Sequence, residues 1–166
     1  MAMIQHIYKS DPILTATIVA SLTLAAAFGF QMAGYAPCDL CWVQRYPYML
    51  IIAVGLLATL TKQKAQFWPL ISITLLSLWD AGVAIYHTGV EQKWWQGPST
   101  CTGGSLDPDT INISIDTLYK MNEAVVRCDE IPWDLFGISM AGFNALIATG
   151  LTLYCIKALL HLAKKV

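Results

Sequence analysis

The chain has 166 residues, of which 56% are hydrophobic and only 13% are charged, and its mean hydropathy is +0.53. A water-soluble domain of this size has too much surface to hide so much apolar side chain, so we expect most of the chain to lie in lipid. The net charge of −1 lacks the basic surplus of a nucleic-acid binder, and we expect no nucleic-acid partner.

Four long apolar runs follow one another along the chain, each near the roughly 20 residues that cross a bilayer as a helix. Helices are expected because lipid offers no partner to unpaired backbone groups. The sequence therefore predicts an all-α membrane protein, a single domain over 1–166, with four transmembrane helices at about 13–33, 41–60, 67–87 and 138–160.

The first run, Ile13 to Ala33, is interpreted as a retained helix, because it is longer than a signal core and no clean cleavage site follows it. The second run is long enough only if Cys41 to Arg45 form its first turn. Pro47 and Pro69 are then expected in the first turns of the second and third helices, where proline is tolerated.

Basic residues near the helix ends predict the orientation. Because lysine and arginine collect on the cytoplasmic side, both termini and the loop after the second run are expected to be cytoplasmic. The lysines that support this are Lys9, Lys62, Lys64, Lys157, Lys164 and Lys165. Two outer loops follow, at about 34–45 and 88–137. In the second, apolar residues recur at near-helical spacing over about 111–126, which predicts a short amphipathic helix on the membrane surface.

The positions of the five cysteines are the main evidence in the sequence for a chemical function. Cys38 and Cys41 form a Cys-x-x-Cys motif in the first outer loop, and Cys101 and Cys128 lie in the second. Both pairs are thus expected on the side of the membrane where disulfides persist. Cys155 falls inside the fourth run and is expected to be a buried, inert thiol.

The Cys-x-x-Cys motif indicates redox chemistry. If Cys41 opens a helix, the helix dipole favours its thiolate, and Arg45 four residues later adds a fixed positive charge on the same face. A thiolate is the species that attacks a disulfide. Other interpretations remain open: four cysteines can hold a zinc ion, Cys101 and Cys128 can form a plain loop staple, and Arg45 can be an interfacial anchor. The spacing of the second pair does not suit zinc, and we expect no metal.

The motif also carries a family resemblance. Residues 37–45, Pro-Cys-Asp-Leu-Cys-Trp-Val-Gln-Arg, combine with four hydrophobic runs and two later cysteines. With Tyr86-His87-Thr88 and Trp133-Asp134-Leu135-Phe136-Gly137, they resemble the DsbB family of bacterial disulfide bond formation proteins. The resemblance implies a quinone-dependent protein-disulfide oxidoreductase in the bacterial inner membrane.

The resemblance implies a role for each matched residue. Cys101 and Cys128 would accept electrons from a periplasmic DsbA-like oxidase with a thioredoxin fold, Cys101 forming the mixed disulfide, and Cys128 would exchange with Cys38. Cys41 would donate electrons to a membrane quinone, with ubiquinone expected before menaquinone. Arg45 would stabilise the thiolate and the quinone. His87 would lie beside the quinone or be an interfacial histidine without a ligand.

Two other functions are compatible with the sequence. One is a thiol enzyme resembling the vitamin K epoxide reductases, and the other is a non-catalytic four-helix scaffold with two static disulfides. Asp80, in the middle of the third run, is expensive in lipid. It either assists proton uptake by the quinone or is hydrogen-bonded against a neighbouring helix.

Overall fold

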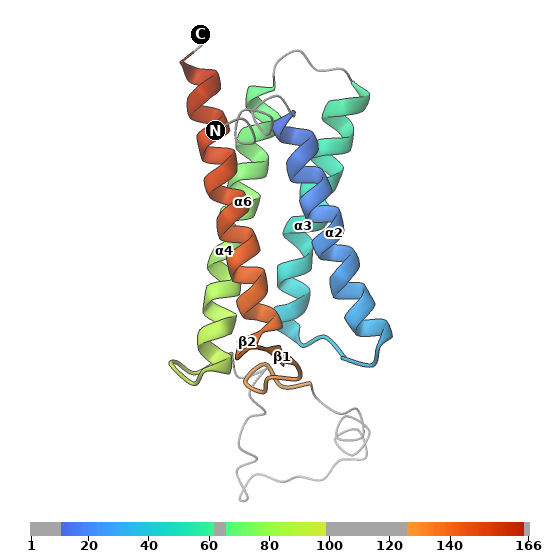
Figure 1. Cartoon of the computed structure of the whole chain (residues 1–166), viewed down its shortest axis with the longest axis vertical. Helices are drawn as coiled ribbons and strands as arrows, with labels where there is room; N and C mark the ends of the chain where they lie inside the picture. The colour runs from blue at the N-terminus through green and yellow to red at the C-terminus, as the bar shows by residue number, and fades with distance from the viewer. Residues whose placement is uncertain (1–10, 62–65, 99–125, 165–166) are drawn as a thin grey trace, which may run out of the picture.

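The computed structural model describes residues 11–61, 66–98 and 126–164. Four long helices in this part of the chain form a bundle, shown in Figure 1. All four are long and apolar enough to cross a membrane, which confirms the predicted four-span membrane protein. The helices are α2 (Pro12–Met32), α3 (Asp39–Leu60), α4 (Phe67–Glu91) and α6 (Met140–Ala163).

The helix ends follow local chemistry. The Asp11 carboxylate accepts the N–H of Ile13 at 2.9 Å and caps α2, with Pro12 in the first turn where its missing N–H does no harm. The end of α4 lies one turn beyond the predicted end at residue 87. This extension brings Glu91 into the bundle, where it is buried.

The second helix begins earlier than predicted. Cys38 is its N-cap, and the Cys38 sulfur accepts the N–H of Cys41 at 3.3 Å, so the helix starts at Asp39. Cys41 therefore lies inside the first turn. Pro47 lies within the helix rather than in its first turn, which corrects the prediction made for it.

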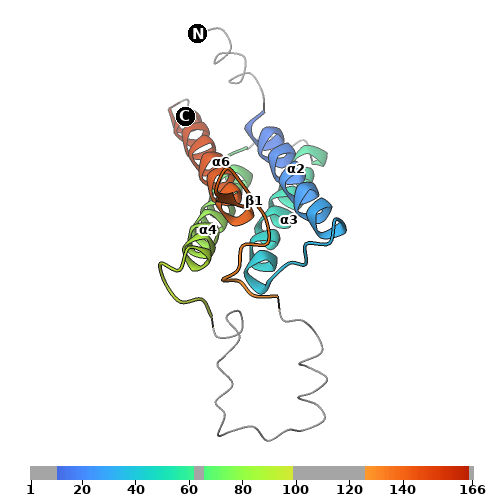
Figure 2. The same cartoon turned by 60° about the horizontal axis from the view of Figure 1, so that its bottom comes forward.

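A short β-hairpin leads into the last helix. Strand β1 (Asp134–Leu135) pairs antiparallel with β2 (Ile138–Ser139), and Phe136 and Gly137 turn between them with φ values of 55° and 78°. Two consecutive positive φ angles are typical of a tight hairpin turn, a conformation that glycine adopts without strain. The sequence analysis placed 138–139 in the fourth helix instead. Figure 2 shows the hairpin at the foot of α6.

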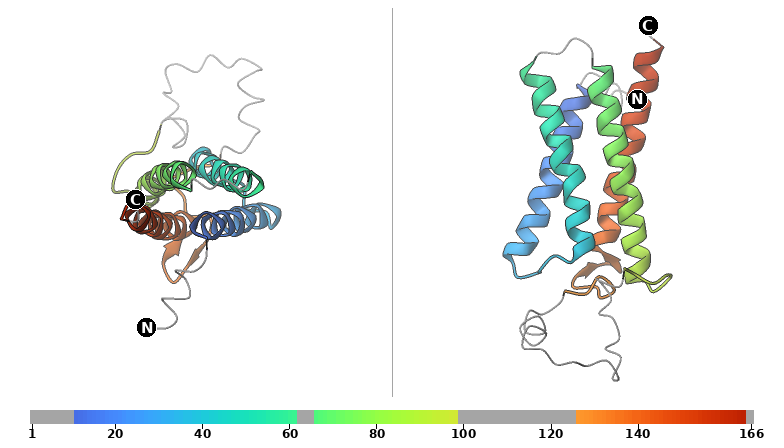
Figure 3. Two further views of the ribbon diagram at one scale, coloured as in Figure 1. Left: turned by 90° about the horizontal axis from the view of Figure 1, so that it is seen from above. Right: turned by 180° about the vertical axis from the view of Figure 1, so that it is seen from behind.

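The four helices form a square in which α4 packs between α3 and α6, while α2 packs on α3 and only sparsely on α6 (Figure 3). At the α2–α3 contact a Cβ on Gly55 would overlap the Thr17 side chain, so only glycine allows this close approach. Cys155 is fully buried in the apolar core of the bundle as a free thiol. The sparse α2–α6 contact leaves room for a cavity.

Both connections that carry cysteines lie at one end of the bundle, which we call the dithiol end. The 33–38 connection joins α2 to α3 there, and the hairpin precedes α6 at the same end, at the bottom of Figure 1. The predicted amphipathic helix at 111–126 falls on residues that, except for the last, lie outside the described ones.

Candidate redox site

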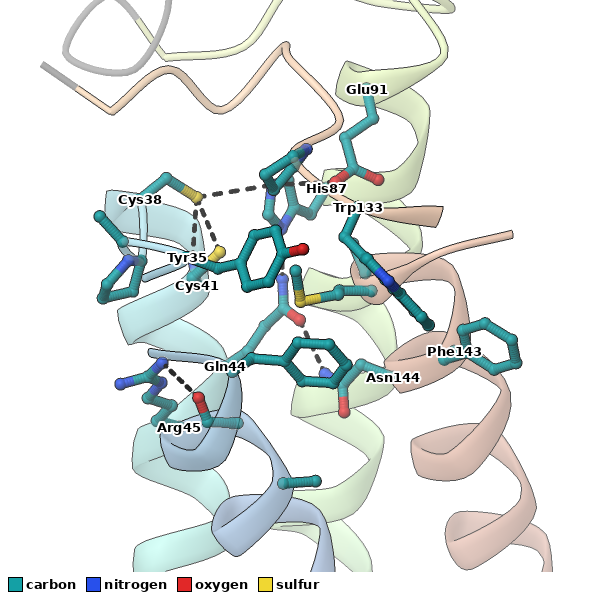
Figure 4. A pocket seen from close by; sticks show the side chains of 18 of the residues that line it. Tyr35, Cys38, Cys41, Gln44, Arg45, His87, Glu91, Trp133, Phe143 and Asn144 are labelled. Atoms are coloured by element: carbon teal, nitrogen blue, oxygen red, sulfur yellow. Dashed lines mark hydrogen bonds and ion pairs between the residues drawn. The ribbon is translucent and has the colours of Figure 1, made fainter. Parts of the chain in front are cut away.

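Cys38 and Cys41 form a close pair of free thiols at the start of α3. Their sulfur atoms are 2.9 Å apart, with Cys38 donating and Cys41 accepting (Figure 4). This hydrogen bond, together with burial, raises the pKa of the Cys38 thiol. Because the raised pKa disfavours ionisation of Cys38, Cys41 is the sulfur better placed to bear negative charge in this state.

His87 connects this pair to the bundle interior. The imidazole comes from the last turns of α4 and is only 2% exposed. Its Nε2 lies 3.6 Å from the Cys38 sulfur and 3.9 Å from a carboxylate oxygen of Glu91. Its Nδ1 lies 2.7 Å from the side-chain nitrogen of Gln44. Of the two expectations for His87, an interfacial residue without a ligand fits this buried setting poorly.

Cys128 lies against the same pair. It is disulfide-bonded and fully buried, in an apolar cluster with Cys38, Leu40 and Val90. The fold thus brings together residues from the two connections at the dithiol end, as exchange between them would need. Cys101 lies outside the described residues.

An ionic cluster holds the segment around Cys128 to the end of α4. Asp129 accepts two hydrogen bonds from Arg127, at 2.9 and 3.0 Å, and one at 2.6 Å from Lys93. The ammonium group of Lys93 also donates to the backbone carbonyl of Asp129 at 2.7 Å. The hydrogen bonds from Arg127 and Lys93 hold the pKa of the Asp129 carboxyl well below its usual range.

Replacing Asp129 with alanine is expected to loosen this segment. Because ion pairs near the surface contribute at most about 1 kcal/mol each, amide hydrogen exchange over 126–133 should quicken by about fivefold near neutral pH. The pKa of Asp129 is depressed in the folded state. The unmodified chain should therefore show the same loosening only as the pH falls below the ordinary aspartate pKa of about 4. Glu130→Ala, which removes one exposed partner of Arg127, is the matched control. Equal exchange in all three proteins would show that the cluster does not hold the segment.

An apolar cavity of about 370 Å³ lies beside the dithiol. Its walls come from all four helices, from the α2–α3 connection and from the residues on both sides of Cys128, and aromatic side chains line it (Figure 4). This volume and an apolar lining with few polar groups are typical of sites for flat organic ligands. All three residues expected to bind a cofactor, Cys41, Arg45 and His87, line it. The aromatic lining residues are Phe30, Tyr35, Tyr48, Trp133 and Phe143.

Arg45 is held at this cavity by several contacts. Its guanidinium donates to the Gln31 side-chain oxygen at 2.6 Å and to the Ala27 carbonyl at 3.2 Å, both on α2. It also lies 4.8 Å from the ring centres of Phe28 and Trp42. The side chain is only 6% exposed, so its charge acts in a poorly solvated setting. A plain interfacial anchor would not need this arrangement.

The ligand atoms of Cys38, Cys41 and His87 all lie within 4.8 Å of one another, close enough to consider a metal. Binding of a metal there would displace the protons of both thiols.

Several residues of the site were not found from the sequence. Gln44 and Asn144 come from different helices and hydrogen-bond to each other at 2.7 Å. Glu91, expected in an outer loop, lies in α4 and accepts a hydrogen bond from Ser139, the N-cap of α6. The available signal for Glu91 was its position four residues after His87, on the same helical face.

Asp80 does not line the cavity. It is fully buried within α4, and both of its carboxylate oxygens lie 3.4 Å from the side-chain nitrogen of Asn144 on α6. Of the two expectations for Asp80, the structure shows the hydrogen bond to a neighbouring helix.

Comparison with known proteins gives a consistent result. Residues 9–158 match the family model described as Disulfide bond formation protein DsbB. The chain is 33% identical to Disulfide bond formation protein B of Dechloromonas aromatica over 73% of each chain. It is 31% identical to Disulfide bond formation protein B 2 of Pseudomonas syringae, over 83% of this chain and 81% of the relative. A Rickettsia prowazekii relative named "Uncharacterized protein RP370" is 28% identical, over 81% of this chain and 77% of the relative. No solved structure matches the chain.

Proposed function

The chain belongs to the DsbB family of disulfide bond formation proteins, and from this we propose that it reoxidises a periplasmic DsbA-like oxidase and passes the two electrons to a membrane quinone. The whole chain would act as one membrane domain, in the bacterial inner membrane with the dithiol end facing the periplasm. Ubiquinone is the quinone we expect before menaquinone.

The observation that carries this proposal is the position of the dithiol in the wall of the apolar cavity. Cys41 lines the cavity within the first turn of α3, and the cavity lies between helices that span the membrane. The apolar, aromatic lining and the volume of about 370 Å³ suit the ring of a quinone. Arg45 and His87 supply the polar groups that would orient the ring's oxygens.

When bound, the quinone supplies an acceptor for two electrons and two protons. The protein's own part is two successive disulfide exchanges, in each of which one S–S bond forms and one breaks. First the reduced partner gives its electrons to the Cys101–Cys128 disulfide and leaves oxidised. The reduced pair then gives them to a Cys38–Cys41 disulfide, which becomes the dithiol seen in the structure.

The residues around the dithiol have separate tasks in this scheme. Cys128 is placed to exchange with Cys38, because both belong to one buried cluster. Cys41 carries the electrons to the cavity. Arg45 keeps a positive charge close to the place where negative charge develops, and His87 contacts the Cys38 sulfur.

Replacing Cys101 with serine tests the entry point for electrons. The variant should oxidise a reduced thioredoxin-like partner at least about a hundredfold more slowly, because the Cys101–Cys128 disulfide that would accept its thiolate can no longer form. Quinone reduction driven by a small dithiol that reaches Cys38 and Cys41 directly should survive. The measurement is quinone absorbance with each reductant in detergent.

Cys155→Ser is the matched control, since Cys155 is buried in the bundle core as a free thiol. It should leave both rates nearly unchanged. Normal oxidation of the partner by the Cys101→Ser protein would show that electrons enter elsewhere.

A further inference from the structure

A continuous series of polar side chains crosses the bundle from Asp80 to the dithiol. Asn144 on α6 donates to the Gln44 side-chain oxygen on α3 at 2.7 Å, and its nitrogen lies 3.4 Å from both Asp80 oxygens on α4. Gln44 reaches His87 at 2.7 Å, and His87 reaches Cys38 at 3.6 Å. Figure 4 shows the part from Asn144 to Cys38. Three helices and the α2–α3 connection thus share one network.

Asp80 and Asn144, at the end of the series farthest from the dithiol, determine which group donates and which accepts in each hydrogen bond. Asn144 turns its NH₂ group toward Asp80, whose two carboxyl oxygens lie within reach to accept from it. Its oxygen then faces Tyr48, whose hydroxyl donates to it at 2.6 Å. The second hydrogen of the NH₂ group is left for the Gln44 oxygen.

This orientation passes on to the histidine. Because the oxygen of Gln44 is taken by Asn144, its NH₂ group faces Nδ1 of His87 and donates to it. Nδ1 therefore holds a lone pair, and in the neutral imidazole the proton is on Nε2. That nitrogen lies 3.6 Å from the Cys38 sulfur and 3.9 Å from a Glu91 carboxylate oxygen, and the ring also interacts with the backbone of Cys128.

We propose that Asp80 and Asn144 are positioning residues that fix the tautomer of His87, so that an N–H group rather than a lone pair faces Cys38. The inference rests on the proposed function for its purpose: Cys38 must leave as a thiolate when its bond to Cys128 breaks in the second exchange, and an N–H donor stabilises that anion. The opposite tautomer would place a lone pair against the thiolate. Asp80 acts at a distance, since it does not line the cavity.

Exchanging Asp80 and Asn144 should reverse the donor and acceptor ends of the hydrogen bonds in the series, while the chain keeps the same two residue types. In the Asp80→Asn/Asn144→Asp protein, the carboxylate at 144 can only accept, so Gln44 must turn its NH₂ group inward and its oxygen toward His87. The proton should then move to Nδ1. The tautomer is read from the ¹⁵N chemical shifts of the imidazole in the reduced protein, without quinone. Replacing His6 and His161 with glutamine leaves His87 as the last of the three histidines.

We expect the Nε2–H tautomer in the parent protein and Nδ1–H after the exchange. In a Cys41→Ser background, where Cys38 is the thiol under test, the exchange should also slow alkylation of Cys38 by about tenfold. Thr152→Val is the control: it removes a buried hydroxyl of α6 that bonds only to its own helix, and it should change neither readout.

Two results would overturn the inference: Nδ1–H in the parent protein, or the same tautomer before and after the exchange. If the exchanged protein does not fold, Gln44→Glu replaces it, because a carboxylate there can only accept from Nδ1–H and should give that tautomer. The expected tautomers together with no quinone reduction would reject the proposed function alone. Quinone reduction with the wrong tautomer would reject this inference alone.

Discussion

Replacing Cys41 with serine is expected to abolish quinone reduction, by about a thousandfold or more, while the bundle stays folded. A serine hydroxyl keeps its proton at neutral pH and cannot replace the thiolate that we propose as the electron donor at the cavity wall. Because the structure holds Cys41 as a free thiol, the substitution removes no disulfide from this state. The measurement pairs the rate of quinone consumption with the thermal unfolding midpoint of the same preparation.

The two halves of that measurement separate an enzyme from a scaffold. A scaffold with a static Cys38–Cys41 disulfide would lose stability on the substitution and have no quinone activity to lose. Cys155→Ser provides the control for a thiol lost from the bundle core. Retained quinone reduction in the Cys41→Ser protein would rule out Cys41 as the electron donor.

Replacing Arg45 with methionine is expected to lower kcat/KM for the quinone by about ten- to a hundredfold. Methionine keeps much of the length and packing of the side chain but removes its charge, and a charge-assisted hydrogen bond contributes about 1.5–3 kcal/mol. Most of the loss should appear at low quinone concentration, as a raised KM. The measurement is the initial rate over a full range of quinone concentrations.

Two further variants distinguish charge from packing at this position. Arg45→Lys keeps the charge but loses the planar group that contacts Gln31 and lies against two aromatic rings, so its loss should be intermediate. Gln31→Leu removes one of the two hydrogen-bond partners on α2 while Arg45 keeps its charge, and it should change KM less than Arg45→Met does. Unchanged kinetics of Arg45→Met at every quinone concentration would contradict the assigned role.

The four spans could be predicted because their signal is local. A run of about 20 apolar residues is visible without knowing what it packs against, and the structure confirms all four. The proximity of the Cys-x-x-Cys motif and Arg45 could also be predicted, because residues a few positions apart at the start of one helix lie near each other. The start of α3 was missed because the cap is a cysteine sulfur rather than one of the usual oxygen caps.

The rest of the site depends on how the helices are rotated against one another. Gln44, His87 and Asn144 come from three helices, and nothing in their separate neighbourhoods indicates that they meet. A membrane helix can be apolar on all faces, so periodicity does not show which face points inward. Asp80 was the one visible clue, because a carboxylate in a membrane span must find a partner.

The β-hairpin was missed for another reason. Ile138 and Ser139 continue the apolar run of the last helix, whereas the structure pairs them with Leu135 and Asp134. The Phe136-Gly137 turn between the strands was the available signal, but strands of two residues carry too little alternation to predict.

We propose that electrons from protein dithiols reach a quinone through this chain. The direct measurement supplies the purified protein in detergent with a reduced thioredoxin-like oxidase and a quinone, and follows quinone absorbance together with the disulfide formed. We expect one quinone reduced for each new disulfide, and none in the Cys41→Ser protein. No quinone consumption, with the cysteines at the dithiol end resistant to alkylation, would contradict it and favour a disulfide-stapled scaffold.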